Sequence, residues 1–451
     1  MTTMQRFARF ATLAVALAFQ GADGALAQTP NTPLRLTLGD ASRAAVEHSA
    51  IADIARVRVD GAKARVRQAK SALLPSLTGT ALQSGRTFNT ATLGIDFPGN
   101  PPLFKPEGQV EGPVNSLDFR GHVVQTIYDQ SARARVRASE SGVIAASAEA
   151  TSAGESAAAA AGIAYVRAQR ADAHLRSRIA DSTLSAELLG IARDLLQAGV
   201  GIALDVTRAQ SQFAGFRAQL IGARNDRARS RLELLRAIGL PLETPIELAD
   251  SLTAPATDEI PNEQAAVDAA LRQRADVRAA EQQLDAMRHQ IAAIRAERLP
   301  TLGVVADQGV IGKTAAHLLA TYTYGIQLSV PVFDGSRRAG RVEEQSALAR
   351  EIEVRERDLR AQIAVEVRGA ILDLSSAREQ VDAVRERVRL SEQEVTQARD
   401  RFSAGVAGNA DVISASLSLS AARTSLVEAE TAYQASRVAL ARAEGTITSL
   451  K

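Results

Sequence analysis

The sequence predicts a mainly α-helical fold with a smaller β portion, in a chain that is internally duplicated. Three observations carry this prediction: a repeated phrase, two long segments without proline, and two short segments with strand periodicity. The phrases LLQAGVGIALDVTRAQSQF and RFSAGVAGNADVISASLSL place Gly199 206 residues before Gly405, and Asp205 206 residues before Asp411. A repeat at this distance indicates one structural unit that is built twice.

The composition is that of long helices with thin cores. Hydrophobic residues make up 46% of the 451 residues, but aromatic residues make up only 4%, and there is no tryptophan. Alanine, arginine and glutamate are abundant, which is typical of long helices rather than of a thick globular core. The formal net charge is +2, and basic residues are interleaved with acidic ones. This pattern indicates solvated helix surfaces and no nucleic-acid partner.

The N-terminus has the pattern of a signal peptide. Two arginines precede an apolar run over 10–19, and small residues at 25–27 offer a cleavage site. We therefore expect residues 1–27 to be removed and the mature chain to begin near Gln28, because the run is too short to span a bilayer. A buried N-terminal helix is the alternative. The chain has no cysteine, so we expect no disulfide and no acylated cysteine.

Proline marks the organisation of the chain. It is absent from 114–240 and again from 332–451, where the helical pattern is strongest. These limits divide the chain into a first structural repeat at 28–240, a linker or equatorial segment at 241–261, and a second repeat at 262–451. Each repeat is expected to contain a helix, a β-hairpin, a long helix, a tip turn and a return helix.

Each repeat opens with a helix that ends at a proline. The first is expected at about 38–74 and the second at about 262–299. The hairpins that follow are expected at 76–129 and 300–334, where the hydrophobic period changes from helical to two. The first hairpin has the longer connection, because it contains the turn-forming sequence FPGNPPLFKPEG.

The hairpin strands alternate between an apolar face and a polar face. In the second repeat the apolar positions are Tyr322, Tyr324, Ile326, Leu328, Val330 and Val332. In the first they are Leu117, Phe119, Val123 and Ile127. A soluble sandwich can have this pattern too, but the concentration of aromatic residues in these segments favours the lipid-facing strands of an outer-membrane barrel. No run after the signal peptide is apolar enough for a membrane helix, so a position in the membrane requires a barrel.

A long helix follows each hairpin, at about 130–198 and 335–404. Each has about 70 residues and is therefore ~100 Å long. Apolar residues recur at sevens, for example at Leu374, Val381, Val388, Val395 and Phe402. The return helices at 206–238 and 412–444 have matching patterns, which predicts antiparallel coiled-coil hairpins. A return helix and a leading helix placed end to end match one long helix in length, which predicts a cylindrical wall.

The residues resemble the TolC-like outer-membrane efflux protein family over about 36–447. The strongest match is the turn from Arg401 to Val412, followed by the Ala/Leu-rich return helix. The phrase at 199–206, the two leucine-proline strand starts and the VPVFDG strand end at 330–335 fit the same family. Each motif is weak alone, and their order and repetition make the resemblance specific.

The resemblance implies a homotrimer in outer-membrane lipid. Each protomer would add four strands to a trimeric 12-stranded β-barrel, and its long coiled-coil helices would form an α-barrel that extends into the periplasm. The implied function is the exit duct of a tripartite efflux or type I secretion system. Such a duct is a passive conduit that is coupled to a periplasmic adaptor (membrane fusion) protein and an inner-membrane transporter. The residues leave the cargo and the class of pump open.

Two aspartates follow the tip turns. Asp205 and Asp411 are expected to cap the return helices, since an aspartate accepts a backbone hydrogen bond there. The resemblance also implies that Asp411 lines a pore constriction at the periplasmic entrance, where a trimer would gather three carboxylates and favour cations. The family's second acidic position is Ser414 here, so the ring would be single.

The resemblance further implies that a tyrosine and an arginine on the turn hold the entrance shut. Their positions are Phe402 and Ala407, which lack the hydroxyl and the charge, so we expect the closed state to be held differently or less tightly. Phe402 and Asp205 are expected beside Asp411 at the constriction. The tip residues that would dock an adaptor are Gly199, Val200, Gly201, Gly405, Val406 and Ala407. Gly199 and Gly405 are expected to end the long helices in the left-handed conformation.

No residue constellation indicates an enzyme. The five histidines lack metal-ligand spacing, cysteine is absent, and there is no nucleophile elbow or phosphate loop. We therefore expect no catalytic, cofactor or metal site. Two other functions remain as alternatives. A periplasmic adaptor would have one hairpin between compact β domains, and a soluble coiled-coil scaffold would leave the strands and the signal peptide unexplained.

Overall fold

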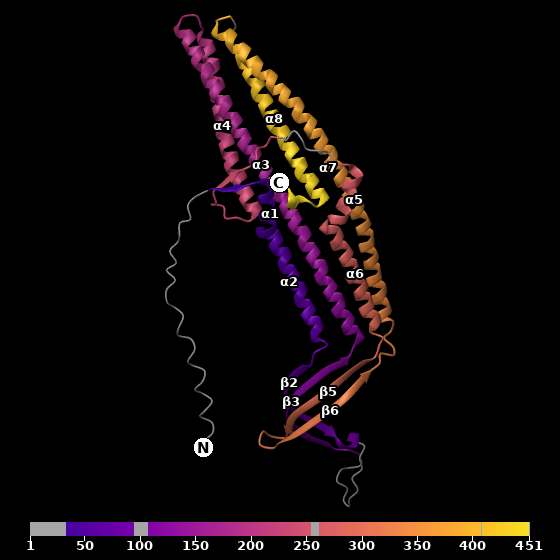
Figure 1. Cartoon of the computed structure of the whole chain (residues 1–451). Coiled ribbons are helices and arrows are strands. Elements are labelled where there is room, and N and C mark those ends of the chain that lie inside the picture. Colours follow the sequence, from indigo (N-terminus) through magenta and orange to yellow (C-terminus); the bar gives the residue numbers. More distant parts are fainter. Residues whose placement is uncertain (1–32, 94–106, 254–260, 407, 451) are drawn as a thin grey trace, which may run out of the picture.

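The computed structural model describes residues 33–93, 107–253, 261–406 and 408–450. It is a long, slightly bent wall of helices with a four-stranded sheet at one end and two helical tips at the other (Figure 1). The fold is mainly α-helical with a smaller β portion, as the sequence predicts. The expected signal peptide and most of the FPGNPPLFKPEG loop lie outside the described residues.

The two halves contain the same succession of elements. In chain order, the first half has β1 (Leu34–Leu36), α1 (Leu38–His48), α2 (Ala50–Ser71), β2 (Ser76–Asn89), the short 3-10 helix η1 (Thr90–Leu93), β3 (Val110–Tyr128), α3 (Gln130–Gln197) and α4 (Ala203–Ile238). The second half has β4 (Ile246–Leu248), α5 (Glu263–Gln273), α6 (Ala275–Ala296), β5 (Thr301–Gly312), β6 (Leu318–Ser329), α7 (Arg337–Ser403), α8 (Asn409–Glu444) and the 3-10 helix η2 (Ile447–Ser449).

Each leading helix is broken, which corrects the expectation of one continuous helix. Ser49 (ψ 145°) separates α1 from α2, and Arg274 (ψ 132°) separates α5 from α6. The Ser49 hydroxyl accepts the Ala52 N–H bond at 3.3 Å and so begins α2. Arg274 makes no such cap. Its guanidinium instead pairs with Asp276 at 2.6 Å and with Glu366 on α7 at 2.7 Å.

The return helices end against these breaks. Gly239 ends α4 in the left-handed conformation (φ 76°), and a Cβ there would clash with the His48 carbonyl oxygen. Gly445 ends α8 in the same conformation, and a Cβ there would lie 3.5 Å from the Arg274 backbone. As a result α1 and α5 pack beside the ends of the return helices. Of the four leading-helix segments, α2 and α6 are the two that continue along the wall toward the sheet.

The long helices α3 and α7 run the length of the wall (Figure 1). They contain 68 and 67 residues. Small buried residues allow close packing against α3: a Cβ on Gly162 would lie 3.1 Å from Val438 of α8, and Ala158 and Ala161 beside it are fully buried. Within the described ranges, no helix combines the length and hydropathy needed to cross a membrane.

A small polar junction fixes the linker to α3 near the middle of the wall. Strands β1 and β4 pair in parallel, and the Asp250 carboxylate beyond β4 accepts the Leu38 N–H bond at 2.7 Å. The buried Tyr165 hydroxyl lies 2.8 Å from the Leu36 carbonyl and 3.1 Å from Asp250. Burial, and next the charge of Asp250, raise the pKa of Tyr165, so the phenol keeps its proton.

The sheet has the antiparallel order β2-β3-β5-β6, so β3 and β5 join the two halves. The register aligns Tyr324 with Ala306, Ala306 with Val123, and Val123 with Leu77. Cross-strand partners share a face of a sheet, so this row lies on one apolar face. The apolar face that the alternation predicts for β3 and β6 therefore continues across all four strands at this row. Strand β6 ends at Ser329, so the predicted positions Val330 and Val332 lie beyond it.

We predict that Gly239→Ala destabilises the protein more than Gly199→Ala. Both residues have positive φ, which costs alanine roughly 1–2 kcal/mol. Only Gly239 has a neighbour within reach of the new Cβ, which adds about 1–3 kcal/mol of overpacking. Thermal unfolding followed by circular dichroism in one detergent should give a larger fall in midpoint for Gly239→Ala. Equal midpoints would contradict the role of the junction with His48.

Candidate functional site

The two tip turns lie side by side at the end of the wall farthest from the sheet (Figure 1). Gly199 and Gly405 end α3 and α7 with φ of 73° and 71°. The next residue in each turn donates its N–H back into the helix, Val200 to Leu195 O at 3.1 Å and Val406 to Arg401 O at 2.9 Å. Both cap glycines face open space, so the left-handed backbone alone requires them.

The tips present apolar side chains to their surroundings. Val200 and Val406 are 73% and 72% exposed. Gly201 has a different constraint, because a Cβ there would lie 2.9 Å from the Leu196 nitrogen. Ala407, the remaining tip residue predicted to contact an adaptor, lies outside the described residues. The tips therefore combine tight turns with exposed valines.

Asp205 and Asp411 do not cap the return helices, contrary to the prediction. Helices α4 and α8 begin earlier, at caps formed by Ile202 and Gly408 without a side-chain hydrogen bond. Both aspartates lie in the first helical turn, where a negative charge is favourable near the helix N-terminus. Asp205 is largely buried and lies 3.9 Å from Arg208, whereas Asp411 is exposed.

Phe402 is buried between the two hairpins. Its side chain is 3% exposed and belongs to an apolar cluster with Leu188, Leu189, Ala192, Ala209 and Val412. The expectation that Phe402 lines a pore constriction is corrected by this burial, because the ring packs on α3 and α8 and has almost no free surface. A phenylalanine, which lacks the hydroxyl of the tyrosine expected from the family resemblance, fits these apolar surroundings.

Asn409, which sequence reasoning missed, joins the two tips. Its side chain is fully buried, and Nδ2 donates to the Asp205 carbonyl oxygen at 2.8 Å. Its Oδ1 has no hydrogen-bond partner among the described residues. An asparagine at the start of a helix is ordinarily a capping residue, so the sequence contained no signal for a contact with the other hairpin.

A buried ion cluster lies farther down the same interface. Asp181 on α3 is 2% exposed and accepts hydrogen bonds from Arg178 (3.1 Å), Ser420 (2.8 Å) and Arg423 (3.2 Å). The last two residues are on α8, so the carboxylate bridges the hairpins. Arg178 also donates to Thr424 at 2.7 Å. In the sequence, Arg178 and Asp181 have the spacing of an ordinary solvated pair, and only the packing of α8 shows the difference.

The chemistry of this region is that of a helical interface. Among the residues that the structure describes, no group of three or more histidines, aspartates or glutamates could hold a metal ion. His174 lies beside the ion cluster in a groove of about 930 Å³ between α3, α4 and α8. Burial, and then the charges of Arg170 and Arg178, lower the pKa of His174, so its imidazole stays neutral near pH 7.

Two curated relatives are similar to part of the chain. The toluene efflux pump outer membrane protein TtgC of Pseudomonas putida is 26% identical over 269 residues, which are 57% of this chain and 54% of the relative. The alkaline protease secretion protein AprF of Pseudomonas aeruginosa is 29% identical over 252 residues, 52% of this chain and 50% of the relative. The chain thus spans about half the length of the curated relatives it matches.

Three solved structures share the fold over most of the chain. The outer-membrane channel OprN is 19% identical, with a TM-score of 0.72 over 90% of this chain and 89% of that one. The outer membrane protein VceC of Vibrio cholerae is 21% identical, with a TM-score of 0.72 over 90% and 96%. The open state of the MtrE outer membrane channel of Neisseria gonorrhoeae is 17% identical, with a TM-score of 0.69 over 90% and 88%.

The family comparison covers both halves of the chain. The model of the outer membrane efflux protein family matches residues 42–240 and 266–446, which are the two structural halves with their hairpins, long helices and tips. On this match, and on a fold shared with solved outer-membrane channels, the chain belongs to the outer membrane efflux protein family.

Proposed function

We propose that the protein is the outer-membrane exit duct of a tripartite efflux or type I secretion system. It is a passive conduit that passes cargo received from an inner-membrane transporter through a periplasmic adaptor. Residues 1–27 direct export as a signal peptide, and the repeats at 28–240 and 262–451 are joined by the equatorial segment at 241–261. The observation that carries the proposal is the sheet, which has one apolar face, one charged face and two unpaired edges.

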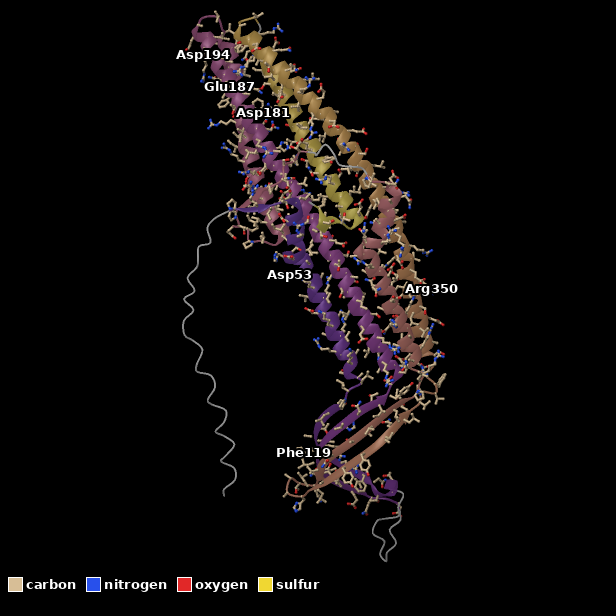
Figure 2. All side chains as sticks on the ribbon, in the orientation of Figure 1. Asp53, Phe119, Asp181, Glu187, Asp194 and Arg350 are labelled. Atoms are coloured by element: carbon tan, nitrogen blue, oxygen red, sulfur yellow. The ribbon has the colours of Figure 1, made fainter. Side chains whose placement is uncertain are left out.

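The two faces of the sheet suit lipid and a water-filled lumen. On the apolar face Tyr322 and Tyr324 stack with ring centroids 6.1 Å apart, and both are exposed in the single chain. On the other face His122 lies 2.6 Å from Asp307, its partner across the strands. Phe119 is on the apolar side and is labelled on the sheet in Figure 2. Alternation of this kind is what an outer-membrane barrel requires.

The unpaired edges support a homotrimer. Strands β2 and β6 are the two edges of the sheet, and four strands are too few to close a barrel. The helical wall is also open, with α2 and α4 at one edge and α7 at the other (Figure 1). Each edge exposes apolar side chains, Ile54 and Val57 on α2, and Val365 and Leu372 on α7. The two edges differ, so one edge of each copy can pair with the other edge of the next copy. Repeated around a rotation axis, this pairing closes a ring, which we take to contain three copies.

The tips support a periplasmic partner. They lie at the far end from the sheet, so a sheet in the outer membrane places Val200 and Val406 deep in the periplasm. Exposed apolar turns of this kind fit end-on contact with a periplasmic adaptor protein. One curated relative is named for toluene efflux and another for alkaline protease secretion. We assign this chain the shared role of an exit duct, with the cargo chosen by the pump.

The duct itself is tested by fractionation and conductance. The full chain expressed in a Gram-negative host should be found in the outer membrane as a heat-modifiable trimer, and the purified trimer should form channels in planar lipid bilayers. Cysteines placed at Val200 and Val406 should crosslink to a periplasmic adaptor, and the chain has no other cysteine. A soluble periplasmic monomer without channel activity would reject the proposal.

The assignment of the sheet faces gives a second prediction. Tyr324→Arg should impair assembly in the membrane, because arginine on a lipid face costs ~2–4 kcal/mol near the bilayer midplane. Thr323→Arg, on the opposite face of the same strand, should assemble like the wild type. The yield of heat-modifiable trimer measures both. Equal yields, or a larger loss for Thr323→Arg, would reverse the assignment.

The exposed Asp411 gives a third prediction. Three copies around the entrance would attract cations, so Asp411→Asn should lower the cation-to-anion permeability ratio about twofold to fivefold, corresponding to at most ~1 kcal/mol for a hydrated charge. Reversal potentials in a salt gradient measure this ratio. Asp205→Asn is the matched control, since its carboxylate is largely buried beside Arg208. If both variants change the ratio equally, Asp411 has no special position at the entrance.

A further inference from the structure

A group of basic side chains lies on α2 and α3 near the sheet, where the two helices run side by side (Figure 1). Arg133, Arg137 and Glu140 recur at i, i+4 and i+7 on α3, so they share one face of that helix. Arg67 and Lys70 share a face of α2 in the same way, and Lys70 pairs with Glu140 at 2.9 Å. This ion pair places both faces on the same side of the wall. We call these five residues the α2–α3 patch; four bases less one acid give it a net charge of +3.

Tyr128 shows which side of the wall the patch occupies. It pairs with Leu302 across the strands. Leu302 is four residues before Ala306 in β5, so it lies on the same apolar face of the sheet. The Arg133 guanidinium lies over the Tyr128 ring, 5.5 Å from its centroid. The α2–α3 patch therefore continues the apolar face of the sheet onto the helices, on the side away from the polar face.

The positive charge of the patch is largely uncompensated. Arg67 and Arg137 are exposed and have no ion-pair partner among the described residues. Arg133 is exposed too, and its contact is with an aromatic ring rather than with a carboxylate. The Lys70–Glu140 pair is about half exposed on both sides and removes one charge of the four. Three guanidinium groups are thus free to bind an anion, and guanidinium is well suited to phosphate because it donates two parallel hydrogen bonds.

The height of the patch matches the headgroup layer of a bilayer. Arg133 and Arg137 are four residues apart, or ~6 Å along α3, and the polar layer on each side of the hydrocarbon core is roughly 5–8 Å deep. Tyr128 precedes them at the boundary, where aromatic side chains concentrate in membrane proteins. Phe333, 205 residues after Tyr128, holds the corresponding position in the second half and is 85% exposed. An apolar sheet face, an aromatic residue and free guanidinium groups thus follow one another in the order that a membrane surface requires.

We propose that the α2–α3 patch binds the phosphate groups of anionic phospholipids in the periplasmic leaflet of the outer membrane. This rests on the proposed function, because the duct places the apolar sheet in that membrane. Arg133 and Arg137 contact the headgroup. Lys70 and Arg67 lie one to two turns farther from the sheet and add attraction that salt screens beyond about 8–10 Å. A lipid fits better than an acidic protein, because the patch directly continues a face that lies in hydrocarbon.

A single tryptophan can report the lipid beside the patch, because the chain has no other tryptophan. Tyr128→Trp keeps an aromatic ring beneath Arg133 and gives the reporter chain. Reporter trimers are reconstituted in phosphatidylcholine bilayers that contain either brominated phosphatidylglycerol or brominated phosphatidylcholine, which quench tryptophan fluorescence on contact. Phosphatidylglycerol should bind about fivefold more tightly than phosphatidylcholine, or better, in 0.1 M salt. The preference should fall in 1 M salt, because the charges are then screened within a few ångströms.

Substitutions in the reporter chain locate the preference. Arg133→Gln combined with Arg137→Gln should lower it to less than about twofold, because both headgroup contacts are lost. Arg65→Gln is the matched control. Arg65 is exposed and without an ion-pair partner among the described residues, but it lines a separate groove with Ala138 on another face of α2 and α3. This variant should keep the full preference. The yield of heat-modifiable trimer establishes assembly, and Arg137→Gln alone should still lower the preference at least twofold should the double variant not assemble.

Two results would overturn the proposal. One is equal quenching by the two lipids in the reporter chain, which is also the result expected if the patch holds an acidic protein. The other is a loss of preference in Arg65→Gln as large as in the double variant. Failure of the duct itself looks different: a chain that does not enter the bilayer is quenched by neither lipid, and the duct falls together with the patch. A trimer that forms channels and is quenched equally by both lipids rejects the patch alone.

Discussion

The close contact between the end of each return helix and the break in a leading helix sets the dimensions of the molecule. Gly239 of α4 lies against the His48 carbonyl, and Gly445 of α8 lies against the backbone of Arg274. Both glycines have the left-handed backbone, and at Gly239 the approach of the His48 carbonyl also excludes a Cβ. Because of this contact, α1 and α5 lie beside the return helices, and α2 and α6 begin at the breaks and run toward the sheet. The long helices α3 and α7 are therefore supported along their whole length, from the strands to the tips.

The sequence was a good guide where one local pattern decides the structure. The absence of proline and the heptad spacing predicted α3 and α7 within a few residues, and the period-two segments predicted the apolar face of the sheet. The breaks at Ser49 and Arg274 were not predictable in this way. Neither residue is a strong helix breaker, and the conformation of each depends on packing against a return helix that is distant along the chain. Tertiary contact decides such a break, and local propensity does not.

The same division holds at the tips. The cap glycines follow from their position at the end of a periodic segment. The burial of Phe402 and Asn409 could not be predicted from their positions in the sequence, because it depends on how one hairpin packs on the other. Asp205 and Asp411 were expected as caps because aspartate is a common capping residue, but α4 and α8 begin earlier without a capping side chain. An amphipathic helix with enough packing partners can start without that bond, and the carboxylates still benefit from the helix dipole.

The interface between the two hairpins combines an apolar cluster with a buried ion cluster. An apolar interface is stable when closed, but its separation exposes surface to water at a cost that grows with area. A buried ion cluster behaves differently, since desolvation already offsets much of its attraction and each charged group regains water when the helices part. Asp181 and its two arginines therefore add geometric specificity to the packing of one hairpin on the other.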